Sequence, residues 1–327
     1  MSLSLGTKAS TSVIALQHAG NVTLFDVDEM ESAMSAAVTG DTIYLNEGTF
    51  DGFTITKQVS IIGAGENTII NGSVKVKMSS DSTTLTSRLL DALTIEGFIY
   101  NTTVLTGMEI RKCTFQGIYF SANVYDVLIE SCYCTGEDCT TSTSNYCFKL
   151  STYVQSMTVQ NSKIHTIIGC GATYDAAVFL NCNIYEVLGG NSSGNSYSTS
   201  YPAFCGIIMN SIVATCVYKS SSYSSLSPYA ILINVLYGSS YLVTYSQNSN
   251  CINYSSPLTE STLECVLTTT ELEDYEYLGN DGTVVGIYGG TTTYSLTPST
   301  PTVESSTISV DTANKKLNVT IKVTTNS

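Results

Sequence analysis

The sequence predicts an all-β protein whose short strands stack into a solenoid. Three observations lead to this prediction: a composition that favours strands, a hexapeptide that recurs through the middle of the chain, and a helical segment ahead of it. Only 12% of the 327 residues are charged and 43% are hydrophobic, and Ser, Thr, Asn, Tyr and Gly fill much of the rest. This polar but weakly charged mixture suits pleated, half-buried strands.

A helix is expected first, because apolar residues near the N-terminus follow the helical period. They are Val27, Met30, Met34 and Val38. Asp26 is the expected N-cap and Gly40 the expected stop. Short alternating strands are expected after it, at 42–45, 53–56, 59–63, 68–72 and 74–78. Such a helix would cover the open end of a strand stack, which otherwise exposes unpaired backbone.

A degenerate hexapeptide then recurs, with 15 to 30 residues between successive members. Its members are IEGFIY (95–100), IRKCTF (110–115), IESCYC (129–134), VQNSKI (159–164), FLNCNI (179–184), IMNSIV (208–213) and LINVLY (232–237). The first position is always apolar, and the third is mostly Asn or another residue that tolerates a left-handed turn. Repeated strand–turn–strand units predict coils about 4.8 Å apart around a shared interior. The member at 95–100 fits least well. A β-sandwich is the competing architecture, but it does not need Asn at one place in four successive members.

These motifs resemble the right-handed parallel β-helix proteins of the pectin lyase-like superfamily. The segment GDTIYLNEGTFDGFTITKQVSIIGAGENTIING (40–72) is similar to their N-terminal coils, and MEIRKCTF and MTVQNSKI are similar to their coil consensus. The resemblance covers about 25–255 and implies a single-stranded right-handed parallel β-helix with an N-terminal capping helix. The segment YLGNDGTVVGIYGG (277–290) resembles the end of secreted β-helix proteins from gut Bacteroidetes that have no assigned activity.

Three regions are expected along the chain. Residues 1–24 form a leader remnant or N-terminal strand, 25–256 form the β-helix with its cap, and 257–327 form a C-terminal cap with a β-hairpin extension. The hairpin is expected around 311–315 because apolar residues alternate on both sides of it. They are Ile308, Val310, Leu317, Val319, Ile321 and Val323. The hairpin either packs along the last coil or belongs to a further domain.

Composition also narrows the expected partners. The net charge is −14 and no basic stripe is present, so we expect no nucleic acid partner. No stretch reaches the length of a transmembrane helix, and MSLSLGTK lacks the apolar core of a signal peptide. The resemblance implies an extracellular or cell-surface bacterial protein whose natural leader has been removed, with a polysaccharide or a cell-surface glycan as partner. No cofactor is expected, and the oligomeric state is left open.

The sequence lacks the catalytic signatures of the enzymes in this superfamily. Lyases need a base and a cation beside a uronic acid, yet no Arg follows Arg111, and no Asp–Asp pair of the hydrolase kind occurs. If the protein is an enzyme, the candidate residues are Lys163, His165 and Tyr185. With Asn183, they are expected on one outward-facing patch of successive coils. The alternative interpretation is four ordinary solvent-facing side chains.

Tyrosines in two long inter-coil segments provide candidate binding residues. The segments are 189–202 and 218–229, and the candidates are Tyr197, Tyr201, Tyr218 and Tyr223. Aromatic rings with a hydroxyl suit stacking on sugars, and loops on a rigid scaffold commonly carry binding residues. The alternative is that these rings only cover sheet edges.

The eleven cysteines are not expected to bind metal. Cys132 and Cys134 fall on inward positions of the hexapeptide, where Cys behaves as a small hydrophobe, and the spacing around them is not a zinc-finger pattern. Cys139 and Cys147 flank a polar segment and form a possible disulfide if the protein is exported. Together these features predict a non-catalytic glycan- or host-surface-binding protein. The alternative is a polysaccharide lyase or hydrolase.

Overall fold

The fold is described from a computed structural model. The described residues are 12–78, 89–136, 148–169, 176–188, 204, 206–217, 230–238, 246–254, 269–274, 276–298, 302–311 and 316–324. The chain divides into two units, Met1–Leu296 and Thr297–Ser327. The expected boundary at 256/257 falls outside the described residues and stays a prediction.

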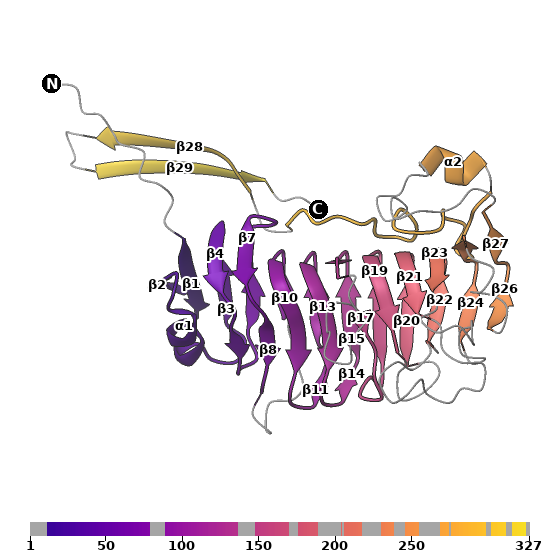
Figure 1. The fold of residues 1–327 in the computed structure, drawn as a ribbon. Helices are drawn as coiled ribbons and strands as arrows, with labels where there is room; N and C mark the ends of the chain where they lie inside the picture. The colour runs from indigo at the N-terminus through magenta and orange to yellow at the C-terminus, as the bar shows by residue number, and fades with distance from the viewer. Residues whose placement is uncertain are drawn as a thin grey trace. The chain divides into compact units, whose positions relative to one another are not determined.

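Two long sheets of mostly parallel strands build the first unit (Figure 1). The first sheet runs in the order β2 (Asn21–Asp26), β1 (Val13–His18), β3 (Thr42–Leu45), β6 (Ser60–Ile62), β9 (Leu90–Asp91), β12 (Glu109–Arg111), β15 (Val127–Glu130), β18 (Met157–Gln160), β20 (Ala177–Leu180), β22 (Ile207–Met209), β24 (Ile231–Ile233) and β26 (Gln247–Ser249). The second sheet runs in the order β27 (Ile252–Asn253), β25 (Leu236–Tyr237), β23 (Ile212–Val217), β21 (Asn183–Leu188), β19 (Lys163–Ile168), β16 (Tyr133–Cys134), β13 (Thr114–Phe120), β10 (Thr94–Asn101), β7 (Thr68–Asn71) and β4 (Gly48–Asp51).

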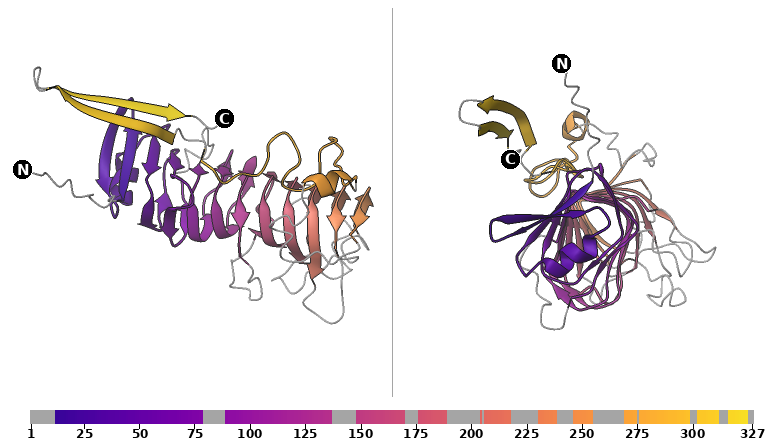
Figure 2. Two further views of the ribbon diagram at one scale, coloured as in Figure 1. Left: turned by 90° about the horizontal axis from the view of Figure 1, so that it is seen from above. Right: turned by 90° about the vertical axis from the view of Figure 1, so that its left-hand side faces the viewer.

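Shorter elements complete the two units. Beside the second sheet lie β5 (Thr54–Ile55), β8 (Val74–Val76) and β17 (Phe148–Lys149), and a small parallel pair is formed by β11 (Leu105–Thr106) and β14 (Val124–Tyr125). The helices are α1 (Met30–Ala36) and α2 (Thr269–Asp274), and the second unit is the antiparallel hairpin of β28 (Thr302–Asp311) and β29 (Lys316–Thr324). Seen along its axis, the first unit shows strands stacked coil upon coil, as in a β-solenoid (Figure 2).

The predicted turn inside each hexapeptide is confirmed. The third-position residues have positive φ angles between 45° and 53°: Lys112, Ser131, Asn161, Asn181, Asn210 and Asn234. The member assigned to 95–100 is wrong, because the left-handed residue of that coil is Ala92 (φ 56°) and the repeat is 90–95. A further turn at Asn250 (φ 52°) extends the repeat by one coil. Asn dominates because its short side chain reduces the cost of the left-handed conformation.

The first position of each corrected repeat points into a continuous core. Leu90, Ile110, Ile129, Val159, Phe179, Ile208 and Leu232 are all completely buried. Aromatic rings stack within this core: Phe179 lies 5.5 Å from Phe148 and 5.8 Å from Phe204, both edge to face. Edge-to-face contact adds stability beyond the burial of each ring.

The N-terminus differs in detail from the prediction. Helix α1 spans only Met30–Ala36, and its N-cap is Glu29, with no side-chain cap. Asp26 is not the cap, because it ends β2 and its backbone N–H donates to the Glu29 carboxylate. Val27 and Val38 are exposed, whereas Met30 and Met34 pack into the main core. Ahead of the helix, β1 pairs antiparallel with both β2 and β3, so β2 is the edge strand at this end of the first sheet.

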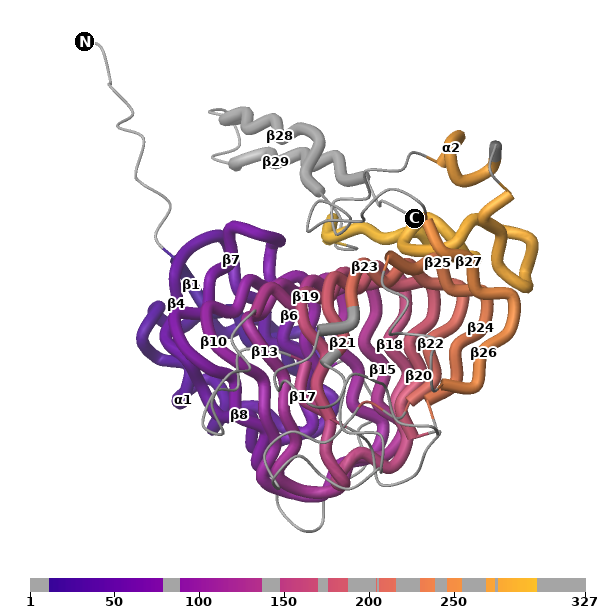
Figure 3. Tube along the Cα trace, turned by 45° about the vertical axis from the view of Figure 1, so that its right-hand side comes forward, coloured from indigo at the N-terminus to yellow at the C-terminus, as the bar shows by residue number. Residues whose placement is uncertain are grey.

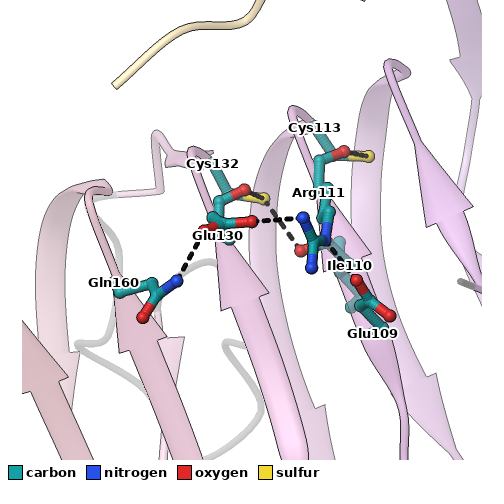
Figure 4. A network of polar contacts seen from close by, with 7 residues as sticks. All are labelled: Glu109, Ile110, Arg111, Cys113, Glu130, Cys132 and Gln160. Atoms are coloured by element: carbon teal, nitrogen blue, oxygen red, sulfur yellow. Dashed lines mark hydrogen bonds and ion pairs between the residues drawn. The ribbon is translucent and has the colours of Figure 1, made fainter. Parts of the chain in front are cut away.

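Thiols and hydroxyls share the fourth repeat position in the coils from Cys113 to Ser211. The Cys132 Sγ lies 3.3 Å from the Glu130 carbonyl oxygen (Figure 4), and the Cys182 Sγ lies 3.3 Å from that of Leu180. The Ser162 hydroxyl makes the same contact with the Gln160 carbonyl at 2.8 Å. The prediction that Cys132 and Cys134 face the interior is therefore confirmed, since both are buried and free.

These buried thiols are expected to resist alkylation. Burial raises the pKa of Cys132, Cys134 and Cys182 to about 12, so little reactive thiolate is present at pH 8. Iodoacetamide followed by peptide mapping should leave these three unmodified in the native protein and modify them in guanidinium. Cys251 is only half-buried and is the internal control, which should react first. Equal native rates at all four would contradict the core assignment.

Candidate functional site

A C-terminal strap, residues 276–296, lies along the ridge formed by the left-handed turns (Figure 3). Asn161 Nδ2 donates to the Gly289 carbonyl at 2.8 Å, and Asn210 Nδ2 donates to Asn280 Oδ1 at 2.9 Å. The Ile287 backbone N–H donates to Asn183 Oδ1 at 3.2 Å. Asn161 and Asn210 therefore bind the strap as well as forming left-handed turns, and Asn183 binds it from strand β21.

Apolar side chains hold the strap at the end of the solenoid near β27. They form a second buried cluster of Ile212, Leu236, Leu272, Val284, Val285 and Ile287. This cluster combines residues of the coils, of α2 and of the strap, so this part of the C-terminal segment packs onto the coils.

The strap changes the interpretation of the predicted catalytic patch. The stacking is as predicted, since Lys163 pairs with Asn183 and the rings of His165 and Tyr185 lie 4.7 Å apart. The predicted solvent exposure is wrong for three of the four residues: Lys163 is 9% exposed, His165 is 7% exposed and Asn183 is fully buried. Tyr185 is half-exposed. The Lys163 ammonium lies 5.0 Å from the centre of the Tyr294 ring, which the strap contributes.

Hydrogen bonds link the buried histidine to a carboxylate. His165 Nδ1 lies 2.9 Å from Thr166 Oγ1, which donates to Glu186 Oε2 at 3.1 Å. Polar chains of this kind position an imidazole in enzymes, but here the ring is covered. A catalytic role for Lys163, His165 and Tyr185 stays a hypothesis.

The other predicted site residues lie outside the described residues. These are the four tyrosines Tyr197, Tyr201, Tyr218 and Tyr223, and the possible disulfide partners Cys139 and Cys147. Their roles stay predictions.

A different set of side chains forms an open row on the second sheet, which we call the Lys–Tyr row. Its members are Lys75, Tyr100, Tyr119 and Lys149, which are paired in register on successive coils and are all half-exposed. The two tyrosine rings are stacked, with centres 5.2 Å apart and planes 6° from parallel. The Lys75 ammonium lies 5.9 Å from the Tyr100 ring centre. The row therefore combines flat apolar faces, hydroxyls and cations.

The hydroxyl of Tyr119 is a hydrogen-bond donor at neutral pH. Partial burial and then the neighbouring Tyr100 raise the pKa of Tyr119 above its usual value. The phenol therefore stays protonated well above neutrality and can donate to a ligand oxygen.

The row ends in a cleft of about 470 Å³ beside α1. Its lining includes Tyr100 and Lys75 from the row, together with the carboxylates of Asp28, Glu31 and Asp51. A concave site with an aromatic wall and a few polar groups is the usual form of a small-molecule site. Among the described residues, the cleft and the row together form the best candidate site.

Sequence reasoning missed the row because it placed the turn of this coil at Gly97. The left-handed residue is Ala92, and β10 alternates without a break, so Ile95 and Ile99 point into the core and Tyr100 points outward. Counting 95–100 as a plain repeat placed Tyr100 inside. The recurring Ile–Tyr pairs at 99–100 and 118–119 are the signal that could have found the row.

On the first sheet, charged and polar side chains of neighbouring strands contact one another. Arg111 forms ion pairs with Glu109 and Glu130, at 2.6 Å from the latter, and Gln160 donates to the same Glu130 carboxylate (Figure 4). These residues come from three consecutive strands. Since the groups satisfy one another, we assign the network to holding the coils together.

Comparisons with protein-family models, with curated proteins and with solved structures returned no match. Within the described ranges, no three His, Cys, Asp or Glu side chains are grouped to hold a metal ion. No helix in that part of the chain is both long and apolar enough to cross a bilayer.

Proposed function

We propose that the chain is a non-catalytic glycan-binding protein displayed outside the cell, and that the Lys–Tyr row with its cleft is the binding site. We further propose a right-handed, single-stranded β-helix of the pectin lyase-like kind, with α1 closing its N-terminal end. The parallel register and the left-handed turns support the β-helix, as does the resemblance of the N-terminal coils. Export is supported by the low charge and by the resemblance to secreted Bacteroidetes proteins.

The stacked pair Tyr100–Tyr119 is the observation that carries the binding proposal. Neighbouring strands lie about 4.8 Å apart, so Lys75 and Lys149 stand about 14 Å apart with both rings between them. Sugar rings stack on such flat faces while their hydroxyls bond to polar neighbours. A short oligosaccharide, free or on a cell surface, fits a platform of this length.

The test is a glycan array followed by calorimetry on the best glycan. Tyr100→Ala together with Tyr119→Ala is expected to weaken binding by about five- to 150-fold, because each lost stacking contact removes about 0.5–1.5 kcal/mol. Tyr125→Ala is the matched control, since Tyr125 is an exposed strand tyrosine outside the row, and it should bind normally. Loss of binding in the control, or none in the double variant, would refute the row as the site.

The alternative function is that of a polysaccharide lyase or hydrolase. The glycans that bind in the first test are also the substrates to try for cleavage. Shortening of a bound polymer, with or without Ca²⁺, would show catalysis. His165→Ala and Tyr185→Phe then decide whether the covered patch is responsible.

A further inference from the structure

Strand β2 is the free edge of the first sheet, and most of its side chains are exposed. Among the described strands it pairs only with β1. Val22 is 63% exposed and Leu24 is 67% exposed, the two highest values among the large hydrophobic side chains described. Thr23, which points to the opposite face, is exposed as well. Seen from the N-terminal end, the indigo β1–β2 hairpin reaches past the outline of the coils (Figure 2).

The side of β2 that faces away from β1 presents the backbone groups of Val22 and Leu24. The β1–β2 turn is Ala19–Gly20, and both residues have positive φ angles, 47° and 82°, as in a two-residue type I′ hairpin. The pair that closes such a turn, His18 with Asn21, is hydrogen-bonded, and bonded and non-bonded pairs then alternate along the strands. Val22 and Leu24 fall in non-bonded pairs, so their N–H and C=O groups point away from β1.

The next outward residue, Asp26, shows that this alternation holds. Its N–H donates to the Glu29 carboxylate at 2.9 Å, and its carbonyl accepts from the Glu29 N–H at 3.0 Å. Val22 and Leu24 have no comparable partner in the described part of the chain. Strand β2 also lacks the features that usually protect an edge, since it contains no Pro and no Lys and its pairing with β1 has no bulge. The edge can therefore accept another strand.

We infer that β2 is a self-association strand, which pairs antiparallel with β2 of a second copy of the chain and continues the first sheet across both. With Val22 opposite Leu24 of the second copy, each of these pairs exchanges two backbone hydrogen bonds, and the two-fold axis passes between the two Thr23 residues. The exposed valine and leucine side chains then pack against one another on one face. Asp26, the only charge in β2, lies opposite Gly20, so no like charges meet across the strands.

Strand length favours a second β2 over the other end of the solenoid as the partner. The first sheet ends there at β26, which has three residues, all polar, whereas β2 has six. Pairing of β2 with β26 would also leave a free edge at each end and build an open fibre, whereas two β2 strands close as a dimer. One pair of such short strands buries less than a standard interface of about 1,600 Å², so the dimer depends on concentration.

The test is sedimentation velocity of the full chain between about 1 and 300 µM, a range suited to a small interface. The wild type should shift from monomer to dimer. Leu24→Lys places a charge in the apolar contact and should stay monomeric over the same range. Val104→Lys is the matched control, because Val104 is an exposed valine outside β2, and this variant should dimerise like the wild type.

Residue-resolved hydrogen exchange follows the edge directly and does not depend on a variant. The amides of Val22 and Leu24 should become protected as the wild-type concentration rises, whereas the Thr23 amide, bonded to β1, should be protected throughout. A wild type that is monomeric at every concentration would overturn the inference. Protection of the Val22 and Leu24 amides in the monomer would also overturn it, because the cover would then lie within one chain. A dimer that persists in Leu24→Lys would do the same.

Discussion

Phe179→Ala is expected to lower the free energy of unfolding by about 3–5 kcal/mol, the usual cost of removing a buried aromatic ring. Phe179 is completely buried and joins Phe148 on one side to Phe204 on the other. The cavity cannot close easily, because the strands of adjacent coils are fixed by parallel hydrogen bonding on both sides of β20. Guanidinium unfolding followed by circular dichroism measures the loss.

Val178→Ala is the matched control, one residue earlier on the same strand. Val178 is half-exposed on the outer face, so its truncation should cost well under half as much as the loss of the ring. In a stacked solenoid the damage should also be local. Hydrogen exchange should increase most at β18, β20 and β22. Equal costs for the two variants would mean that the strand's inward and outward faces are assigned wrongly.

The repeat could be predicted because it is a local pattern. Each hexapeptide contains its own strand, turn and strand, and the left-handed residue is marked by Asn or by a substitute such as Lys112. The inward positions follow from alternation, which is why Cys132 and Cys134 were placed correctly. The orientation of Tyr100 was missed because the turn of its coil was placed at Gly97 instead of Ala92, although β10 itself alternates without a break.

The burial of Lys163, His165 and Asn183 could not be predicted, because it depends on contacts between residues far apart in the sequence. Asn183 and Ile287 are 104 residues apart, and no local pattern links them. An outward position on a strand was read as a solvent-facing one, but Lys163 lies against Tyr294 of the strap. The same Asn residues that signal the turns also bind the strap, and one sequence cannot separate these two roles.

Gly286→Ala is expected to detach part of the strap. Gly286 has φ +84°, and a Cβ there would lie 2.5 Å from Asn183 Oδ1 and 2.9 Å from Ile212 Cδ1. The amide oxygen cannot move away freely, because Asn183 is fully buried and its oxygen accepts from Ile287. The clash adds about 1–3 kcal/mol to the roughly 1–2 kcal/mol that a positive φ costs any Cβ.

Gly282→Ala separates the cost of the steric clash from the backbone cost of a positive φ. Gly282 is also in the strap and has φ +76°, but a Cβ there would meet nothing within 4 Å. The Gly282→Ala variant should lose only the stability that a positive φ costs a residue with a Cβ, and its strap should stay bound to the coils. Acetylation of Lys163 by acetic anhydride is the measurement, since that ammonium lies beneath Tyr294 and should react faster only after Gly286→Ala.

The same pair of variants tests what the covered patch is for. If the strap serves only to bury Asn and apolar side chains, Gly286→Ala should lose stability and gain Lys163 reactivity, while the panel of polymers stays intact. If Lys163, His165 and Tyr185 carry chemistry, displacing the strap from Lys163 and Asn183 should produce polymer cleavage in Gly286→Ala that Gly282→Ala lacks. Glycan binding at Tyr100 and Tyr119 should be equal in both variants, because the row is formed by strands that make none of these strap contacts. Binding that changes with the strap would mean that the two surfaces are coupled, and that the row alone is not the site.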